Sequence, residues 1–304
     1  MTLLKSLLRN RNAIFLLALA AGLAFPAVTP VTRHLVLPAL ALAMALSTME
    51  IGNDLFRKPR ALLFPAFLGI IMSYIILGNI IIGLAAFMIH DETIWTGFIL
   101  LAAVPPAVAV IPFSGFLKGN GPLSLVGTVG AYLGGLAIMP LIAVGLLSSA
   151  AFNHLQLLMI TLELIVLPLC VSRILIREGW RERIAPYRGT VTNWSFFVVL
   201  YTLVGLNRSI ILGQTSTLLP VAAISIFTTL ILGFLIDWIG SRFHLPRETR
   251  TSLVLLGTLK NQGMAGGIAL TMFSQEAALP AAVSTMVMIF YIIWLDFRKR
   301  WNGT

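Results

Sequence analysis

The chain has 304 residues, of which 58% are hydrophobic and 11% are charged, against roughly 45–50% and about 25% in soluble domains. This composition excludes a soluble globular domain. The net charge of +10 does not indicate DNA or RNA binding, because the basic residues lie between apolar runs and form no continuous face or arm.

Ten apolar runs, each about as long as a transmembrane helix, follow one another along the chain. They cover residues 13–30, 35–52, 61–89, 93–113, 123–147, 155–176, 190–206, 215–238, 250–273 and 277–295. The sequence therefore predicts an all-α integral membrane protein with ten transmembrane helices and short loops.

The basic residues predict the orientation of these spans. With the N-terminus inside, every Lys and Arg falls in a predicted cytoplasmic segment except Arg33, Arg208 and Lys260. Because cytoplasmic loops carry the excess of Lys and Arg, we expect a multi-pass protein of the cytoplasmic (inner) membrane with both termini in the cytoplasm. The start of the chain also resembles a signal peptide, but no clear small-x-small cleavage site precedes the second span, so we expect the first span to be retained.

Ten spans divide into residues 1–150, with spans 1–5, and residues 151–304, with spans 6–10. An odd number of spans in each half inverts the second half relative to the first, as in transporters with inverted repeats. The fourth span of each half is interrupted, by Pro105 and Pro106 in the first and by glycines such as Gly263 in the second. Interrupted helices in matching positions indicate a binding site near the bilayer midplane. For either helix alone, a packing kink is the alternative.

Lys260 lies in the middle of the ninth span. An ammonium at this depth is energetically costly, so it normally faces a wet cavity or the protein interior and has a function. Asn261, Gln262 and Gly263 follow directly, which brings a charge, two amides and a flexible position together at the break. The alternative is a lysine that extends to the membrane interface.

Four more side chains are candidates for the site. Glu163, in the sixth span, is a candidate counter-ion for Lys260 or a proton carrier, and a structural, protonated carboxyl is an equal alternative. Ser114, Ser124 and Thr128, around the fourth and fifth spans, are candidates to line the site, although hydroxyls also bond to their own helix.

The sequence contains no spacing of His, Cys or acidic residues typical of a metal site. Cys170 is the one cysteine, so no intrachain disulfide can form. Intramembrane catalysis is not expected either, because paired aspartates, a metal-binding helix motif and a Ser/His pair are all missing at membrane depth. We predict no metal, no cofactor and no enzyme activity.

Three segments, in the order of the spans, are similar to motifs of one transporter family. They are Met44–Arg60 (MALSTMEIGNDLFRKPR), Leu117–Thr128 (LKGNGPLSLVGT) and Lys260–Leu270 (KNQGMAGGIAL). In turn they resemble the end of the second span, the stretch after the first broken helix and the second broken helix of the bile acid/sodium symporter family. The auxin efflux carriers, a sister family, are the alternative.

The resemblance implies a core of spans 3–5 and 8–10 that rocks against a panel of spans 1, 2, 6 and 7, with the broken fourth and ninth helices crossing in the core. In sodium-coupled members, two sodium ions bind at this crossing. Carried over to this sequence, Ser124 and Thr128 match hydroxyl ligands of sodium. The usual Ser-Asn pair, however, falls on Val110 and Ile111, and a usual glutamine falls on Lys260.

These departures predict a divergent member without sodium coupling. The usual glutamate of the ninth span falls near Leu256, and hard cations need several oxygen ligands, whereas a fixed positive charge repels them. We expect the ammonium of Lys260 to take the place of the ions, bonded to Ser124, Thr128 or freed backbone carbonyls. A desolvated lysine can also exchange protons, so proton coupling stays open.

Together, these features predict a secondary transporter that moves a small organic anion by alternating access. The anion preference rests on the resemblance and on helix N-termini, whose positive dipole ends attract carboxylates. The candidate substrate residues are Pro105, Pro106, Ser114, Asn261, Gln262 and Gly263. An ordinary sodium symporter and a membrane receptor that does not transport are the alternatives. Beyond the lipid bilayer no protein partner is evident, and the substrate, the direction of transport and the oligomeric state stay open.

Overall fold

The structure is a computed structural model that describes residues 10–49, 59–147 and 153–301. The described residues form helices and no strands, and one isolated β-bridge joins Pro106 to Lys260. The predicted boundary between the two halves, at residue 150, lies outside the described residues. So do the predicted cytoplasmic residues Lys5, Arg9, Arg57 and Lys58.

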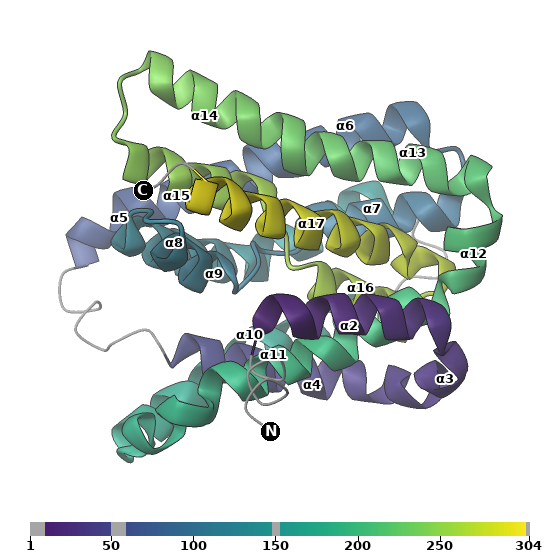
Figure 1. The fold of residues 1–304 in the computed structure, drawn as a ribbon, viewed down its shortest axis with the longest axis horizontal. Coiled ribbons are helices and arrows are strands. Elements are labelled where there is room, and N and C mark those ends of the chain that lie inside the picture. The colour runs from purple at the N-terminus through teal and green to yellow at the C-terminus, as the bar shows by residue number, and fades with distance from the viewer. Residues whose placement is uncertain (1–9, 50–58, 148–152, 302–304) are drawn as a thin grey trace.

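In the first part of the chain, helices occupy the predicted apolar runs one after another (Figure 1). They are α2 (Arg11–Ala24), α3 (Thr29–Thr32), α4 (Val36–Thr48), α5 (Pro59–Ile70), η4 (Ile71–Gly78), α6 (Asn79–Met88), α7 (Glu92–Ala103), α8 (Val110–Phe116) and α9 (Gly121–Leu146). Short 3-10 turns, η1 (Pro26–Val28) and η2 (Arg33–Leu35), join α3 to its neighbours. The π-helical turn η4 joins α5 and α6 into one rod.

The second part of the chain is also helical. It contains α10 (His154–Arg177), α11 (Trp180–Leu206), α12 (Arg208–Gly213), α13 (Thr215–Ile226), η6 (Phe227–Ile231), α14 (Leu232–Arg242), α15 (Arg247–Thr258), α16 (Gln262–Met272), η7 (Glu276–Ala278) and α17 (Leu279–Trp301). Like η4, η6 is a π-helical turn in the middle of a long rod. The π turns fall in the predicted third and eighth spans, and the breaks fall in the fourth and ninth.

Seven helices of the described chain are long and apolar enough to cross a membrane. Of the other predicted spans, the first is the short α2, and the fourth and ninth are split into α7 and α8 and into α15 and α16. The boundary between the first two spans also differs from the prediction: α2 ends at Ala24, and one helical stretch covers Pro26–Thr48. The turn falls here because Pro26 cannot continue a preceding helix. α11 begins at Trp180 instead of near residue 190, since its first residues are helical but polar.

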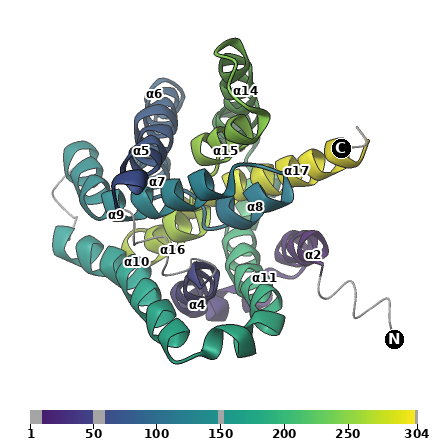
Figure 2. The same cartoon turned by 90° about the vertical axis from the view of Figure 1, so that its left-hand side faces the viewer.

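The helices form two layers, which Figure 2 shows end-on. One layer contains α2, α4, α10 and α11, which contact one another closely, and we call it the panel layer. The other contains α5 to α9 and α13 to α17, and we call it the core layer. The half-helix α16 contacts both α4 and α11, so the broken ninth span lies where the layers meet.

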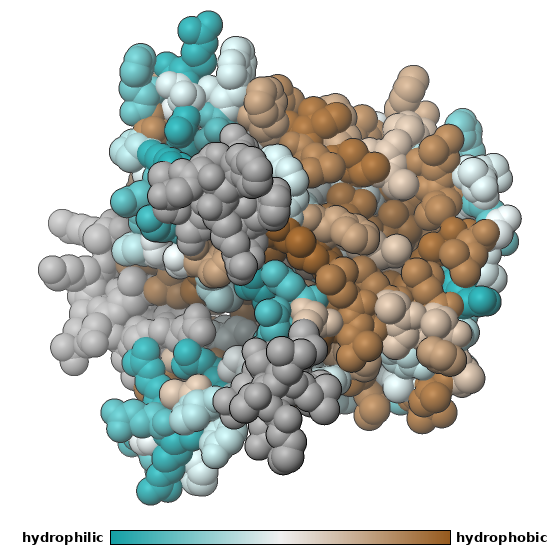
Figure 3. All heavy atoms as spheres, viewed as in Figure 1, coloured by the Kyte–Doolittle hydropathy of each residue, from teal (hydrophilic) through white to brown (hydrophobic). Residues whose placement is uncertain are grey.

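Most helices run along the long axis of the molecule, so the loops gather at two ends. In Figure 3 hydrophobic side chains fill the middle, and hydrophilic side chains lie toward the two ends. At one end lie α3 and α12 (right in Figure 1); we call this the α12 end. At the opposite end lie α8 and the turn between α14 and α15. This banded surface is that of a multi-pass membrane protein.

Candidate transport site at the crossing of two broken helices

Two interruptions of helical structure cross in the core layer. The first separates α7 from α8, and the second separates α15 from α16. The two non-helical segments are hydrogen-bonded to each other. The amide of Ala107 donates to the carbonyl of Leu259 (2.9 Å), and the amide of Asn261 donates to the carbonyl of Pro105 (2.9 Å). Backbone groups that lost their helical partners at each break are therefore satisfied by the other break, as membrane depth requires.

Proline explains where the first break falls. In an α-helix the carbonyl of Ala102 would accept from the amide four residues later, but that residue is Pro106, which has no N–H. The carbonyl of Leu101 likewise lacks a donor, because the residue four positions later is Pro105. α7 accordingly ends at Ala103, and its last carbonyls are free to accept hydrogen bonds from elsewhere.

Lys260 uses these carbonyls. Its Nζ donates to the carbonyl of Ala102 (2.7 Å) and to that of Val104 (2.8 Å). The same ammonium lies 4.4 Å from the ring centroid of Tyr74, within the range of a cation–π contact. The lysine is 2% exposed, so a charged side chain from the second break fills the acceptor site that proline creates at the first.

The charge of Lys260 has no carboxylate beside it in the described part of the chain. Every acidic side chain whose environment is described is exposed, and the ammonium contacts two carbonyls and one aromatic ring. Glu163 is exposed on α10, so the structure does not bring it together with Lys260 as a counter-ion. Carbonyl dipoles and a ring face therefore carry the local stabilisation of this ammonium.

Asn261 links the second break to α9. Its Oδ1 accepts from the amide of Met264 (3.0 Å) and so caps the N-terminus of α16, while its Nδ2 donates to the hydroxyl of Tyr132 (2.9 Å). Gln262, the next residue, is also buried. At Gly263 an added Cβ would lie 2.7 Å from a methyl group of Leu40, so glycine lets α16 approach the panel helix α4.

Tyr74 and Tyr132 were not identified from the sequence, although both take part in the site. The hydroxyl of Tyr74 donates to the carbonyl of Ala131 on α9 (2.9 Å), which holds its ring over Lys260. A Cβ at Gly135 would lie 2.4 Å from that hydroxyl, so this glycine makes the room. Aromatic residues within an apolar run carry no distinctive signal, since they are just as suitable for lipid contact.

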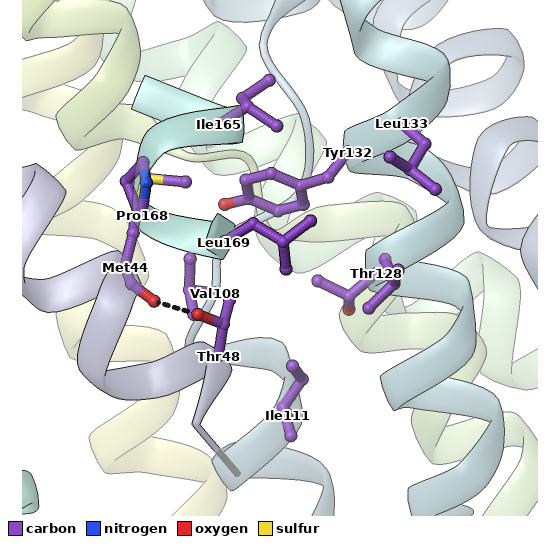
Figure 4. A pocket seen from close by; sticks show the side chains of 11 residues that line it. Met44, Thr48, Val108, Ile111, Thr128, Tyr132, Leu133, Ile165, Pro168 and Leu169 are labelled. Atoms are coloured by element: carbon purple, nitrogen blue, oxygen red, sulfur yellow. Dashed lines mark hydrogen bonds between the residues drawn. The ribbon is translucent and has the colours of Figure 1, made fainter. Parts of the chain in front are cut away.

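A pocket lies beside the crossing, between the two layers (Figure 4). Its lining is apolar except for three hydroxyl groups, those of Thr48, Thr128 and Tyr132. The residues that line it come from four segments: Met44 and Thr48 of α4; Val108 and Ile111 around the first break; Thr128, Val129, Tyr132 and Leu133 of α9; and Ile165, Pro168 and Leu169 of α10. The pocket is thus shared by both layers.

The remaining predicted site residues lie at different places. Ser124 and Thr128 are buried on α9, and neither hydroxyl has a hydrogen-bond partner among the described residues. The predicted bond from Lys260 therefore goes to freed carbonyls and not to these hydroxyls. Ser114 lies away from the crossing, on α8, where its Oγ is 3.3 Å from that of Ser252 on α15.

A buried charge at the crossing of two interrupted helices in a membrane protein is an arrangement typical of secondary transporters. The chain belongs to the SBF-like CPA transporter family, which matches residues 44–295. The resemblance to the bile acid/sodium symporter family that the sequence motifs indicated is thereby confirmed, and the protein is a membrane transporter. No curated protein matches the chain.

Proposed function

We propose that this protein is a secondary transporter that moves a small organic anion by alternating access, without sodium, and with Lys260 in the place of the sodium ions. The observation that carries the proposal is the position of the Lys260 ammonium, which donates to the carbonyls of Ala102 and Val104 at the crossing. A cation that is covalently attached at this point does structurally what a bound metal ion would do.

The surroundings of the lysine favour an anionic substrate and disfavour sodium. Sodium, as a hard cation, needs several oxygen ligands, and two carbonyls at the crossing are already taken by the ammonium. A positive charge with no described carboxylate beside it attracts an anion and repels a second cation. Lys260 is also buried away from water, and a desolvated lysine can exchange protons. Proton exchange by Lys260 as a coupling mechanism is therefore part of the proposal.

The architecture that we propose is ten spans in two inverted repeats, residues 1–150 and 151–304. It is supported by the matching positions of the π turns η4 and η6 and of the two breaks. Rocking of the core layer against the panel layer would then alternate access to the pocket between them. The end with α8 and the turn from α14 to α15 would be cytoplasmic, since Lys118 lies just after α8, Arg242 ends α14 and Arg247 begins α15, and cytoplasmic ends carry the excess of Lys and Arg.

Ligand-dependent stability of the purified protein tests the proposal. The thermal midpoint is measured in detergent across pH, in sodium chloride and in potassium chloride of equal concentration, for the wild type and for Lys260→Gln. A ligand that binds the folded state raises this midpoint. We expect no difference between the two salts for the wild type, and a dependence on pH that is weaker in Lys260→Gln.

Transport completes the test. In proteoliposomes that contain the wild type, a pH gradient should drive uptake of members of a panel of carboxylates and sulfonates, and Lys260→Gln should abolish it. A sodium-specific rise in the thermal midpoint of the wild type would overturn the sodium-independent mechanism and favour an ordinary sodium symporter. Saturable binding of an anion with no counterflow would favour a receptor.

A further inference from the structure

Both basic residues that the sequence leaves between spans on the non-cytoplasmic side have a partner at the α12 end. The guanidinium of Arg33, in η2, donates through Nη2 to the carbonyl of Leu270 on α16. That of Arg208, in α12, donates through Nε to the carbonyl of Leu23 on α2 (2.6 Å). These two arginines are the basic residues that the sequence places in non-cytoplasmic loops, and each makes a specific contact.

A third bond at this end has the same form. Nε2 of Gln275, between α16 and η7, donates to the carbonyl of Leu206, the last residue of α11. All three acceptors lie in the last turn of a helix, where carbonyls have no intrahelical partner. The helix dipole makes such carbonyls good acceptors for a cation. The α12 end is therefore fastened by side chains that cap helix C-termini.

The three bonds differ in what they connect. Leu206 belongs to the panel layer, and Arg33 lies in η2, which packs against the panel helices α4 and α11. Their partners, Gln275 and Leu270, belong to the core layer, so two of the bonds cross between the layers. The bond from Arg208 joins α12 to the panel helix α2. Behind the crossing bonds the interface is closed: Val36 is 1% exposed, and a Cβ on Gly267 of α16 would lie 3.2 Å from its Cγ1.

The pocket lies away from these bonds. Among its lining residues is Thr48, at the opposite end of α4 from Arg33. The two residues are 15 positions apart in one helical stretch, which corresponds to about 22 Å at 1.5 Å per residue. Cross-layer hydrogen bonds at one end and a pocket toward the other are what a transporter closed on one side requires.

We propose that Arg33 and Gln275 form a clasp, defined by their bonds to Leu270 and Leu206, that holds the α12 end of the layer interface closed. The clasp must open before that end becomes accessible, and because each bond joins a side chain to one carbonyl, the release needs no change in either helix. This inference rests on the proposed alternating access, for which it identifies the residues that control one of the two closed ends.

Cysteine labelling tests the clasp on the whole protein in nanodiscs. In a Cys170→Ala background, Val36→Cys reports access at the α12 end, and its rate of reaction with a polar maleimide is measured. Gln275→Ala removes the clasp bond to Leu206, which does not involve the helical stretch that carries the Val36→Cys reporter. We expect labelling about fivefold faster, the change in an equilibrium constant that the loss of one hydrogen bond produces.

Arg208→Ala is the matched control, since it removes the same kind of bond at the same end, between α2 and the connecting helix α12, and leaves both clasp bonds intact. Its labelling rate should equal that of the parent. Arg33 lies close to Val36, so Arg33→Ala is read at Thr48→Cys instead, where labelling should slow as the population shifts. Gln275→Glu, which keeps the size but removes the donor, repeats the test if Gln275→Ala does not purify as a single species.

Equal labelling of the Gln275 and Arg208 variants would overturn the clasp. The result is separable from the proposed function, because labelling requires no substrate. If the clasp variants behave as expected while no anion is transported, the layers move and the proposed function fails. If the Lys260 variants lose transport while labelling is unchanged, only the clasp fails.

Discussion

The first and second breaks at the crossing exchange a backbone hydrogen bond in each direction, but their side chains differ. The first break, between α7 and α8, has two prolines and no charged side chain, so it offers no side-chain donor and presents the carbonyls of Ala102 and Val104. The second, between α15 and α16, has Lys260 and Asn261, whose side chains supply N–H donors. Similar interruptions of a helix therefore have different chemistry.

The comparison shows that the two breaks are not interchangeable copies. A break with only free carbonyls would need a cation or water to satisfy them, and a break with a buried ammonium would need acceptors. Because the two breaks lie against each other, the ammonium of one satisfies the free carbonyls of the other inside the protein. Three substitutions test how much these hydrogen bonds stabilise the fold. The first removes the Lys260 donor, the second removes the bond from Asn261 to α9, and the third removes the proline that leaves the carbonyl of Ala102 free.

Removal of the donor should have the largest effect. In Lys260→Met the carbonyls of Ala102 and Val104 lose their partner in a buried place, at a cost of about 1–3 kcal/mol each. We expect the free energy of unfolding to fall by about 3 kcal/mol, measured as a lower thermal midpoint in detergent. Arg247→Met, which removes an exposed charge, is the control. An unchanged midpoint for Lys260→Met would mean that water replaces the ammonium at no cost.

Asn261→Ala should come next. The substitution removes the N-cap of α16, which contributes about 1 kcal/mol, and the bond to the hydroxyl of Tyr132, so we expect a loss of about 2 kcal/mol. Asn261→Asp separates the two contributions, because it keeps the capping oxygen and removes the donor. In a double-mutant cycle with Tyr132→Phe, the coupling of the amide and the hydroxyl should be about 1 kcal/mol; additive effects would contradict the bond.

Pro106→Ala should have the smallest effect. The new amide at position 106 can donate to the carbonyl of Ala102, in competition with Lys260, so we expect α7 to lengthen and the thermal midpoint to shift by the equivalent of about 1 kcal/mol. Hydrogen exchange over residues 104–108 should slow at the same time.

Pro105→Ala is its matched control, because the amide at that position would seek the carbonyl of Leu101, which is not an acceptor of Lys260. Equal shifts in Pro105→Ala and Pro106→Ala would mean that the choice of acceptor at the end of α7 does not matter for the site. A shift confined to Pro106→Ala would identify the carbonyl of Ala102 as the limiting acceptor.

The sequence by itself determined the class of the protein and the positions of its interruptions. Hydrophobicity over about 20 residues reports which segments suit the bilayer, and Pro105, Pro106 and Lys260 are unusual enough at membrane depth to be recognised without a structure. It did not determine the ends of helices that leave the membrane. α11 begins at Trp180, because polar residues can continue a helix beyond the apolar segment that hydropathy identifies. The π turns also carried no recognised signal.

Only the tertiary structure decided which groups meet. Lys260 had three candidate kinds of partner: Glu163, the hydroxyls of Ser124 and Thr128, and freed carbonyls. The choice depends on how α7, α9 and α10 are rotated about their axes, and that is set by packing between helices that are distant in the chain, such as α9 against α5 and α10 against α4. Tyr74 joins the site for the same reason, because its ring reaches Lys260 only where Gly135 leaves room for its hydroxyl.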